Sequence, residues 1–195
     1  GIGHGDNLTV YDLDGDGKAE VVVRTANGVV LPNGTTVVAP NNEVQYISII
    51  DGLTGTEKAR ATVPIPASWV TKTHVQGQMG IFYPDGIKPS IFFHPSNRNP
   101  DESFNKFGVA WDYRNGVLSQ RWIWMPAGHT AEGHQIRFAD VDNDGKDEYV
   151  DVGNVVKSDG TGQINESVLT EVVHGDRFHV TDIDPDRPGL ETFLI

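Results

Sequence analysis

Short apolar segments alternate with turn residues along the whole chain. In the first third, the segments rich in β-branched and aromatic residues are 8–13, 19–25, 44–51 and 57–63. The 22 glycines and 11 prolines are spread between such segments. Short apolar runs bounded by glycine and proline are typical of β-strands joined by tight turns. We therefore predict an all-β fold, and we find no segment with the periodicity of an amphipathic helix.

The same order of elements returns along the chain, which indicates a repeat. The second unit contains the predicted strands 74–82, 87–93, 107–113 and 117–124. Units of four strands are typical of β-propeller blades. We predict one partial propeller over 1–195, with blades at about 1–66, 67–127, 128–172 and an incomplete 173–195. A ring of blades needs about four to eight of them, so three to three and a half blades predict part of a larger propeller. Further copies or a partner chain would complete the ring in the alternative reading.

One acidic motif recurs between the first and second strands of the units. The candidate metal ligands are Asp12, Asp14, Asp16, Lys18 and Glu20 in the first copy, Asp140, Asp142, Asp144, Lys146 and Glu148 in the second, and Asp182, Asp184, Asp186 and Glu191 in a looser third copy. Alternating carboxylates followed by a glycine suit Ca²⁺, which takes about six to eight oxygen ligands, and each lysine would contribute its carbonyl oxygen. We predict two Ca²⁺ sites and a third in the looser copy. The alternative for each is a solvated acidic turn.

These loops differ from EF-hands. The position of the EF-hand glutamate holds Val23 in the first copy and Asp151 in the second, and both copies run into strand-like sequence. In the second unit, residues that cannot bind Ca²⁺ in this way replace the motif: Phe82, Pro84, Gly86 and Ser90. We therefore predict Ca²⁺ loops between strands, and no metal in the second unit.

Histidines stand in register ahead of the acidic motifs. His174 precedes the third copy by eight residues, as His4 and His74 precede the corresponding positions of their units, and His134 lies two residues after the aligned Glu132. A strand of about six residues spans ~20 Å, so the histidines should lie at the opposite end of each blade from the Ca²⁺ loops. That end surrounds the mouth of the central channel, where propellers usually bind ligands.

We predict His134 and His174 as catalytic residues, and Asp176 and Arg177 as substrate-binding residues. A neutral imidazole can take a proton near neutral pH, and a guanidinium can stabilise developing negative charge. The structural alternative is that each histidine holds a loop between blades and that Arg177 is a solvated charge.

Charge and composition exclude several classes of function. The net charge is −12, from 27 acidic and 15 basic residues, and no basic stripe is present, so we expect no nucleic-acid partner. No apolar run is long enough to span a membrane. The chain has no cysteine, no initiator methionine and no signal peptide, which predicts a mature or excised segment without disulfides. Weak Ca²⁺ sites work best where Ca²⁺ is abundant, so we expect a secreted or extracellular protein.

Several motifs together resemble one family. GHGDNLTVYDLDGDGKAEVVVRTANG, EGHQIRFADVDNDGKDE, SDGTG, HGDRFHVTDIDPDRPGLETF and the aromatic stretch KFGVAWDYRNGVLSQRW resemble the rhamnogalacturonan lyases, family 11 of the polysaccharide lyases. The resemblance implies an eight-bladed, Ca²⁺-rich propeller with a deep central cleft. It also implies β-elimination of the rhamnosyl–galacturonate bond in rhamnogalacturonan I. The chain departs from the family pattern at 94–98 and at Gly133, and we expect the family's usual catalytic lysine and arginine to lie beyond Ile195.

Two functions follow from these observations. The first is a segment of a Ca²⁺-dependent rhamnogalacturonan lyase, a carbon–oxygen lyase of pectin degradation that lacks part of its active site and acts on an acidic polysaccharide. The alternative is a non-catalytic Ca²⁺-binding propeller module for glycan binding or extracellular assembly. Open blade edges expose unpaired strands, so self-association is also expected.

Overall fold

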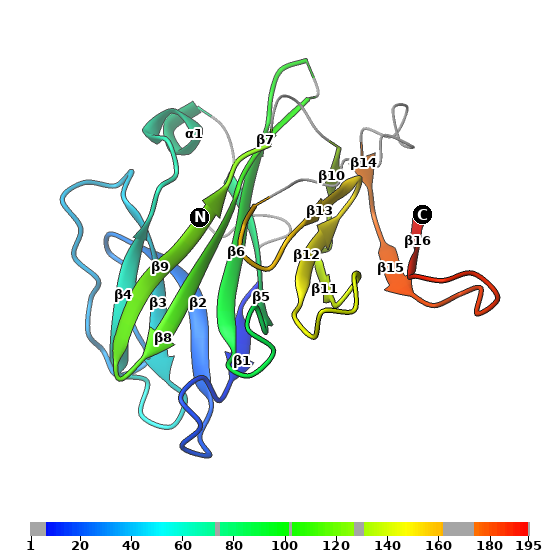
Figure 1. The fold of residues 1–195 in the computed structure, drawn as a ribbon. Helices are drawn as coiled ribbons and strands as arrows, with labels where there is room; N and C mark the ends of the chain where they lie inside the picture. Colours follow the sequence, from blue (N-terminus) through cyan, green and yellow to red (C-terminus); the bar gives the residue numbers. More distant parts are fainter. Residues whose placement is uncertain (1–6, 73–74, 102, 127–130, 162–173, 195) are drawn as a thin grey trace.

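The computed structural model describes residues 7–72, 75–101, 103–126, 131–161 and 174–194. Its regular structure is almost entirely β, which confirms the predicted fold class (Figure 1). The strands form several antiparallel sheets. Within the described ranges a single short helix occurs, α1 (Ala67–Lys72), where we expected none. It is far too short to cross a membrane, and no other described segment forms a membrane-spanning helix.

The first sheet is an antiparallel meander. Its strands, in spatial and chain order, are β1 (Thr9–Tyr11), β2 (Glu20–Ala26), β3 (Gln45–Asp51) and β4 (Glu57–Val63). Alternate residues dominate the burial of β2, whereas β3 buries both faces, because Ile50 packs against Leu31 and Val37 on the side opposite the main core. Val22, Ile47 and Ile49 have no exposed surface.

The second sheet repeats this order with one addition. Its strands are β5 (Val75–Phe82), β6 (Ser90–Arg98), β8 (Gly108–Arg114) and β9 (Val117–Trp124), and β7 (Phe104–Lys106) pairs with the far end of β6. β6 starts and ends later than the predicted strand at 87–93. Asp85 accepts hydrogen bonds from the amides of Ile87 and Lys88 and keeps them in a turn. At the other end, polar residues of 94–98 stay in the strand because polar side chains pair with them.

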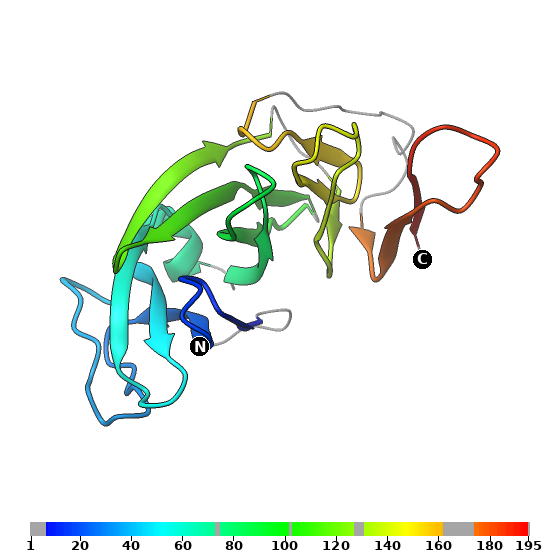
Figure 2. The same ribbon diagram turned by 60° about the horizontal axis from the view of Figure 1, so that its bottom comes forward.

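The remaining strands are shorter. They are β10 (Glu132–Gly133), β11 (Arg137–Ala139), β12 (Glu148–Asp151), β13 (Asn154–Val156), β14 (His174–Gly175), β15 (Phe178–Thr181) and β16 (Glu191–Leu194). β11, β12 and β13 form one antiparallel sheet and β15 and β16 another, whereas β10 and β14 pair in parallel. The sheets follow one another along an arc (Figure 2). β1 contacts β5, and β11 contacts β15. The described strands close no ring, so the propeller and its blade boundaries stay predictions.

Two hydrophobic clusters join the first three sheets. The first lies between the first and second sheets and contains Val22, Ile47, Ile49, Ile91, Phe93, Val109 and Trp111. The second lies between the second and third sheets, where the rings of Phe92 and Tyr149 stack with centroids 4.3 Å apart. Each aromatic side chain removes a large apolar area from water, which makes these clusters the main source of stability.

The loop of the second unit packs against the acidic loop of the third. The Tyr83 amide donates to Asp147 Oδ2 at 2.8 Å, and the Asp147 amide donates to the Tyr83 carbonyl at 3.1 Å. Gly86 has φ of +71°, and a Cβ at this residue would lie 2.3 Å from the Gly145 carbonyl oxygen. The two loops therefore touch through their backbones, and glycine is required at the contact.

We expect Gly86→Ala to destabilise the protein more than Gly116→Ala. Both glycines have positive φ, which disfavours alanine by roughly 1–2 kcal/mol, but a Cβ at Gly116 meets no atom within 4 Å. The additional loss in free energy of unfolding for Gly86→Ala measures the contact between the two loops. Urea denaturation of both variants tests this, and equal midpoints would contradict the contact.

Candidate functional site

The two complete acidic loops share most of their internal hydrogen bonds. The Asp12 carboxylate accepts from the amides of Gly15, Asp16 and Gly17 at 2.8, 3.1 and 2.9 Å. Its counterpart in the second copy accepts at 3.0 and 2.9 Å from the equivalent amides of Asp144 and Gly145. The first aspartate thus ties the loop together, and the glycine at +83° or +84° permits the turn.

Each loop also closes through its last carboxylate. Glu20 and Glu148 are buried, and they accept from the amides of Leu13 at 2.9 Å and Val141 at 3.0 Å. This bond brings three carboxylates together in each loop, with oxygens within 4.8 Å of one another. The groups are Asp12, Asp14 and Glu20 in the first loop and Asp140, Asp142 and Glu148 in the second. Oxygens that share one Ca²⁺ at about 2.3–2.6 Å lie within ~5 Å of each other, so the donor sets fit this ion.

The other predicted ligands lie outside these groups. Asp16 and Asp144 instead accept the backbone amides of Lys18 and Lys146 at 2.8 and 2.9 Å. In the third copy, the Glu191 carboxylate accepts from the amides of Ile183 and Asp184 at 2.9 and 3.2 Å, which preserves the loop closure. Asp182, Asp184, Asp186 and Glu191 form no comparable group of three among the described residues.

The two loops differ in their electrostatics. Lys58 Nζ lies 2.9 Å from Asp14 Oδ2 and 2.7 Å from Glu20 Oε1. The hydrogen bond from Lys58 lowers the pKa of Asp14, and the two carboxylates raise the pKa of Lys58. In the second loop Lys146 and Lys157 lie 2.7 and 3.9 Å from Asp144 and Asp142, but no ammonium within the described residues pairs with Glu148. Burial, followed by the nearby aspartates, raises the pKa of Glu148. Glu20 therefore has an ammonium partner, whereas Glu148 has none among the described residues.

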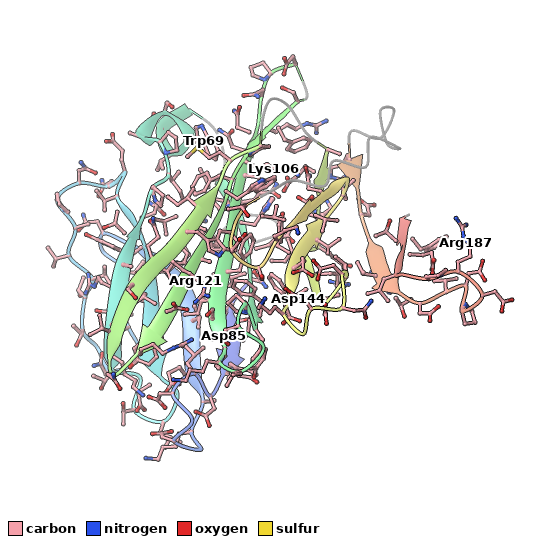
Figure 3. All side chains as sticks on the ribbon, in the orientation of Figure 1. Trp69, Asp85, Lys106, Arg121, Asp144 and Arg187 are labelled. Carbon is pink, nitrogen blue, oxygen red and sulfur yellow. The ribbon has the colours of Figure 1, made fainter. Side chains whose placement is uncertain are left out.

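The second unit replaces the lost carboxylates with an ion pair. At the position of Glu20 stands Ser90, whose Oγ donates to Asp112 Oδ1 at 2.6 Å. Arg121 Nη1 donates to the other oxygen of Asp112 at 3.1 Å. Figure 3 labels Arg121, which comes from β9, and Asp85, which comes from the loop between β5 and β6. Burial alone would raise the pKa of Asp85. The hydrogen bonds from the amides of Lys88 and Ile87 and the charge of Arg121 outweigh burial, so this pKa is lowered. Guanidinium groups thus supply positive charge beside this loop.

The predicted histidines meet at the other end of the sheets. The rings of His134 and His174 lie with centroids 4.7 Å apart and planes at 78°. Asp176 Oδ1 lies 3.8 Å from His134 Nε2 and 3.6 Å from His174 Nδ1. His174 lies in β14, and His134 and Asp176 directly follow β10 and β14; these two strands lie at the opposite end from the acidic loop that follows β11 (Figure 1). We call His134, His174 and Asp176 the imidazole group.

Backbone pairing and a neighbouring aromatic ring place the residues of the imidazole group. The His134 amide donates to the Gly175 carbonyl at 3.1 Å, so the parallel pairing of β10 and β14 places the histidines side by side. The Phe104 ring lies nearly parallel to His174, with centroids 5.9 Å apart. Arg177 is exposed. The structure therefore brings together three of the four residues predicted for catalysis and substrate binding, whereas His4 and His74 lie outside the described residues.

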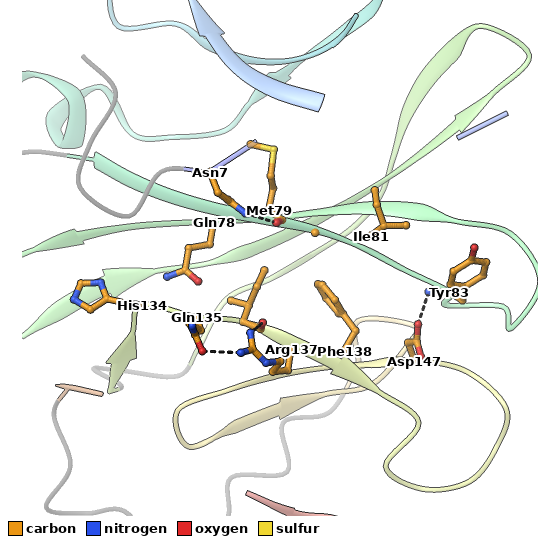
Figure 4. A pocket seen from close by; sticks show the side chains of 12 residues that line it. Asn7, Gln78, Met79, Ile81, Tyr83, His134, Gln135, Arg137, Phe138 and Asp147 are labelled. Atoms are coloured by element: carbon orange, nitrogen blue, oxygen red, sulfur yellow. Dashed lines mark hydrogen bonds between the residues drawn. The ribbon is translucent and has the colours of Figure 1, made fainter. Parts of the chain in front are cut away.

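A cavity of about 610 Å³ extends from His134 between β5 and β11 (Figure 4). Gln78, Gln135 and Arg137 supply polar groups to its lining. The Arg137 guanidinium donates to the Ile136 carbonyl at 2.9 Å and to Gln135 Oε1 at 2.6 Å, which fixes its plane. A guanidinium has five N–H donors and pairs well with carboxylates. Sequence reasoning missed Gln78 and Arg137, because polar residues in predicted strands usually face solvent.

Similarity to known proteins defines the class of protein. Two curated proteins of Bacillus subtilis (strain 168) match 98% of this chain: rhamnogalacturonan exolyase YesX, 33% identical over 218 residues, and rhamnogalacturonan endolyase YesW, 32% identical over 216 residues. The solved structure of rhamnogalacturonan lyase YesW covers 96% of the chain with a TM-score of 0.81 at 31% identity. A Bacillus licheniformis rhamnogalacturonan lyase gives a TM-score of 0.80 at 28% identity over 96% of the chain. These relatives are polysaccharide lyases.

The family follows from a match over almost the whole chain. Residues 2–195 match the family model described as rhamnogalacturonan lyase family 11, C-terminal domain. The chain therefore belongs to rhamnogalacturonan lyase family 11, which confirms the resemblance of its motifs. It covers 34% and 33% of the two curated relatives and 35% of each solved chain, so it spans about a third of their length.

We expect Glu148→Gln and Glu20→Gln to change stability in opposite directions when divalent cations are chelated. Glu148→Gln removes a buried charge without an ammonium partner and keeps an acceptor for Val141, so the free energy of unfolding should rise. Glu20→Gln leaves the Lys58 ammonium without one of its two carboxylates, which should lower the free energy of unfolding by about 1–3 kcal/mol. Chemical denaturation in EDTA measures both, and losses of the same sign would contradict the charge difference.

Acidification provides a second measurement on the same variants. A pKa raised in the folded state means that folded protein binds the proton more readily, so this contribution favours folding at low pH and disappears as pH rises through the folded-state pKa. The stability advantage of Glu148→Gln over the wild type should therefore shrink as pH falls from neutral towards the ordinary glutamate pKa of about 4.3.

Proposed function

We propose that this chain is a segment of a Ca²⁺-dependent rhamnogalacturonan lyase that cleaves rhamnogalacturonan I by β-elimination on a β-propeller scaffold. The curated relatives bear the names rhamnogalacturonan exolyase and endolyase, which supports the substrate class. The observation that carries the proposal is the imidazole group beside the cavity of Arg137. Two proton-transfer groups and a carboxylate-binding cation next to one cavity suit chemistry on a uronate.

The reaction needs three contributions from the protein. Elimination removes the C5 proton of a galacturonate, breaks the bond between C4 and O4, and leaves a double bond between C4 and C5, with the proton returned to the departing oxygen. A neutral imidazole of His134 or His174 serves as the base for C5. Positive charge near the C6 carboxylate stabilises the charge that develops in the transition state, and Arg137 lies on the cavity wall for this purpose. Asp176 orients the imidazoles, and Arg177 contacts the polysaccharide.

The acidic loops are the proposed Ca²⁺ sites. Asp12, Asp14 and Glu20 would hold one ion, Asp140, Asp142 and Glu148 a second, and the third copy a further one. Bound Ca²⁺ neutralises like charges and stabilises only the folded state, by RT ln(1 + [L]/Kd). Sites of this kind suit a secreted protein in a Ca²⁺-rich medium.

A second function has an observation of its own in support. The acidic loops are complete within a chain that spans about a third of its relatives, so Ca²⁺ binding needs no other part of such a protein. A non-catalytic module for glycan binding or extracellular assembly would use them in the same way. Exposed sheet edges would then serve self-association or further blades.

The ultraviolet absorbance of the unsaturated uronate tests the lyase function. In the full-length protein with rhamnogalacturonan I and Ca²⁺, we expect absorbance to rise. His134→Gln or His174→Gln should each slow the rise about 100-fold or more, as expected for loss of a general base. His179→Gln is the matched control because His179 is exposed on β15, outside the imidazole group. Glycan binding without any product would favour the non-catalytic module.

Lys58→Met tests the Ca²⁺ assignment of the first loop. The ammonium of Lys58 contacts two of the proposed ligands, so it competes with a divalent cation, and its removal should raise the Ca²⁺ affinity of this loop by about tenfold or more. Lys88→Met is the control, since Lys88 is exposed in the second unit, which lacks the acidic motif. Titration calorimetry measures both affinities. Absence of Ca²⁺ binding in the wild type and both variants would refute the metal sites.

A further inference from the structure

A cluster of ionisable side chains is buried between the second and third sheets. His94, Lys106, Glu132, Tyr149 and Asp151 are all at most 5% exposed. They come from β6, β7, β10 and β12. Burial of a charge costs several kcal/mol unless a partner compensates it. We call these five residues the buried network.

Hydrogen bonds link the members of this network. The Tyr149 hydroxyl donates to Asp151 Oδ2 at 2.7 Å, and its oxygen lies 2.6 Å from His94 Nδ1. His94 Nε2 lies 3.1 Å from Glu132 Oε2. His94 therefore bridges Tyr149 and Glu132 through its two ring nitrogens.

Lys106 brings positive charge to two carboxylates of the network. Its Nζ donates to Asp151 Oδ2 at 2.6 Å and lies 3.9 Å from Glu132 Oε2. Burial would raise the pKa of Glu132, but His94, Lys106 and Ser96 lower it. Each buried carboxylate thus has compensating partners, which a buried ionic cluster requires.

The network holds the backbone just ahead of His134. Lys106 Nζ donates to the Ala131 carbonyl, and Gln78 Nε2 donates to the Gly133 carbonyl at 2.7 Å. Glu132 lies between these two residues. Three successive residues before His134 are therefore fixed by side chains of the second sheet.

This anchoring determines the register of a very short strand. β10 contains two residues, so its backbone pairing with β14 alone specifies register weakly. A slip by one residue would exchange Glu132 with Gly133 at the centre of the network. A Cβ at Gly133 would lie 2.7 Å from Val152 Cγ2, so the slipped side chain would also have no room.

We propose that Glu132, with His94 and Lys106 as its partners, is a positioning residue that holds His134 against His174 and Asp176. The significance of the imidazole group rests on the proposed lyase function, whereas the positioning itself does not. An apolar replacement of a buried ionic cluster often preserves stability. Stability alone therefore does not explain the network, and its contacts with residues 131–133 supply a specific role.

The imidazole ¹⁵N and ¹H resonances of the ¹⁵N-labelled chain test this proposal. We expect Glu132→Gln to move the resonances of both His134 and His174 and to leave the exposed His179 in place. Ile49→Val, in the hydrophobic cluster between the first and second sheets, is the control for lost stability, and it should move none of the three. Spectra of folded Glu132→Gln with His134 and His174 unchanged would overturn the proposal and leave a purely structural network.

Two further variants keep the test decisive if Glu132→Gln folds poorly. Ser96→Ala removes only the 2.8 Å hydrogen bond to Glu132 Oε1, so it should move the same resonances less. His94→Gln combined with Glu132→Gln removes both partners of the contact between these two side chains, so the double variant should be less destabilised than the sum of the single variants. Additive losses with unmoved resonances in Ser96→Ala would also overturn the proposal.

The full-length protein separates this proposal from the lyase function. With rhamnogalacturonan I, Glu132→Gln should lower kcat more than it raises KM, since a displaced base affects the chemical step. If the wild type shows no lyase activity but the imidazole resonances still move, the proposed function fails and the positioning role stands. If activity is present and Glu132→Gln leaves kcat unchanged, the positioning proposal fails alone.

Discussion

The architecture depends on a hydrogen bond from a backbone amide to a glutamate side chain. Glu20, Glu148 and Glu191 each accept the amide of the residue that follows the first aspartate of their loop. Each of these glutamates also pairs in the sheet with the residue just before that aspartate: Tyr11, Ala139 or Thr181. The two strands of all three hairpins therefore pair in the same register next to the loop. The extra residue of the third loop is accommodated within the turn. A sheet whose first hairpin is fixed in this way presents its apolar face consistently to the next sheet.

Local sequence patterns determined the strands where packing and periodicity agree. The strands at 57–63 and 117–124 have the predicted bounds, because alternation and turn residues coincide at their ends. β6 differs because Asp85 delays its start and because the polar stretch from His94 to Arg98 is paired rather than solvated. Asn97 pairs with Asn105 of the nearby β7, but the partners of His94 and Ser96 come from β10 and β12, far along the chain, so no local pattern indicates their pairing.

The candidate site was predictable in part for the same reason. Register with the acidic motifs pointed to His134, His174 and Asp176, and the repeat brings them together. Gln78, Arg137 and the buried network depend on which sheet edges meet, which no single segment specifies. The stretch 94–98 and Gly133 lie in one region, because His94 and Ser96 both bond to Glu132, the neighbour of Gly133. Residues far apart in sequence thus form one connected group.

The different surroundings of Glu20 and Glu148 have a consequence for the whole molecule. Lys58 pairs with Asp14 and the buried Glu20 inside the first sheet, whereas the lysines of the second loop, Lys146 and Lys157, pair with aspartates at exposed positions. Salt screens exposed ion pairs more than buried ones. The ionic strength of the medium should therefore affect the sheet that leads to the imidazole group more than the N-terminal sheet.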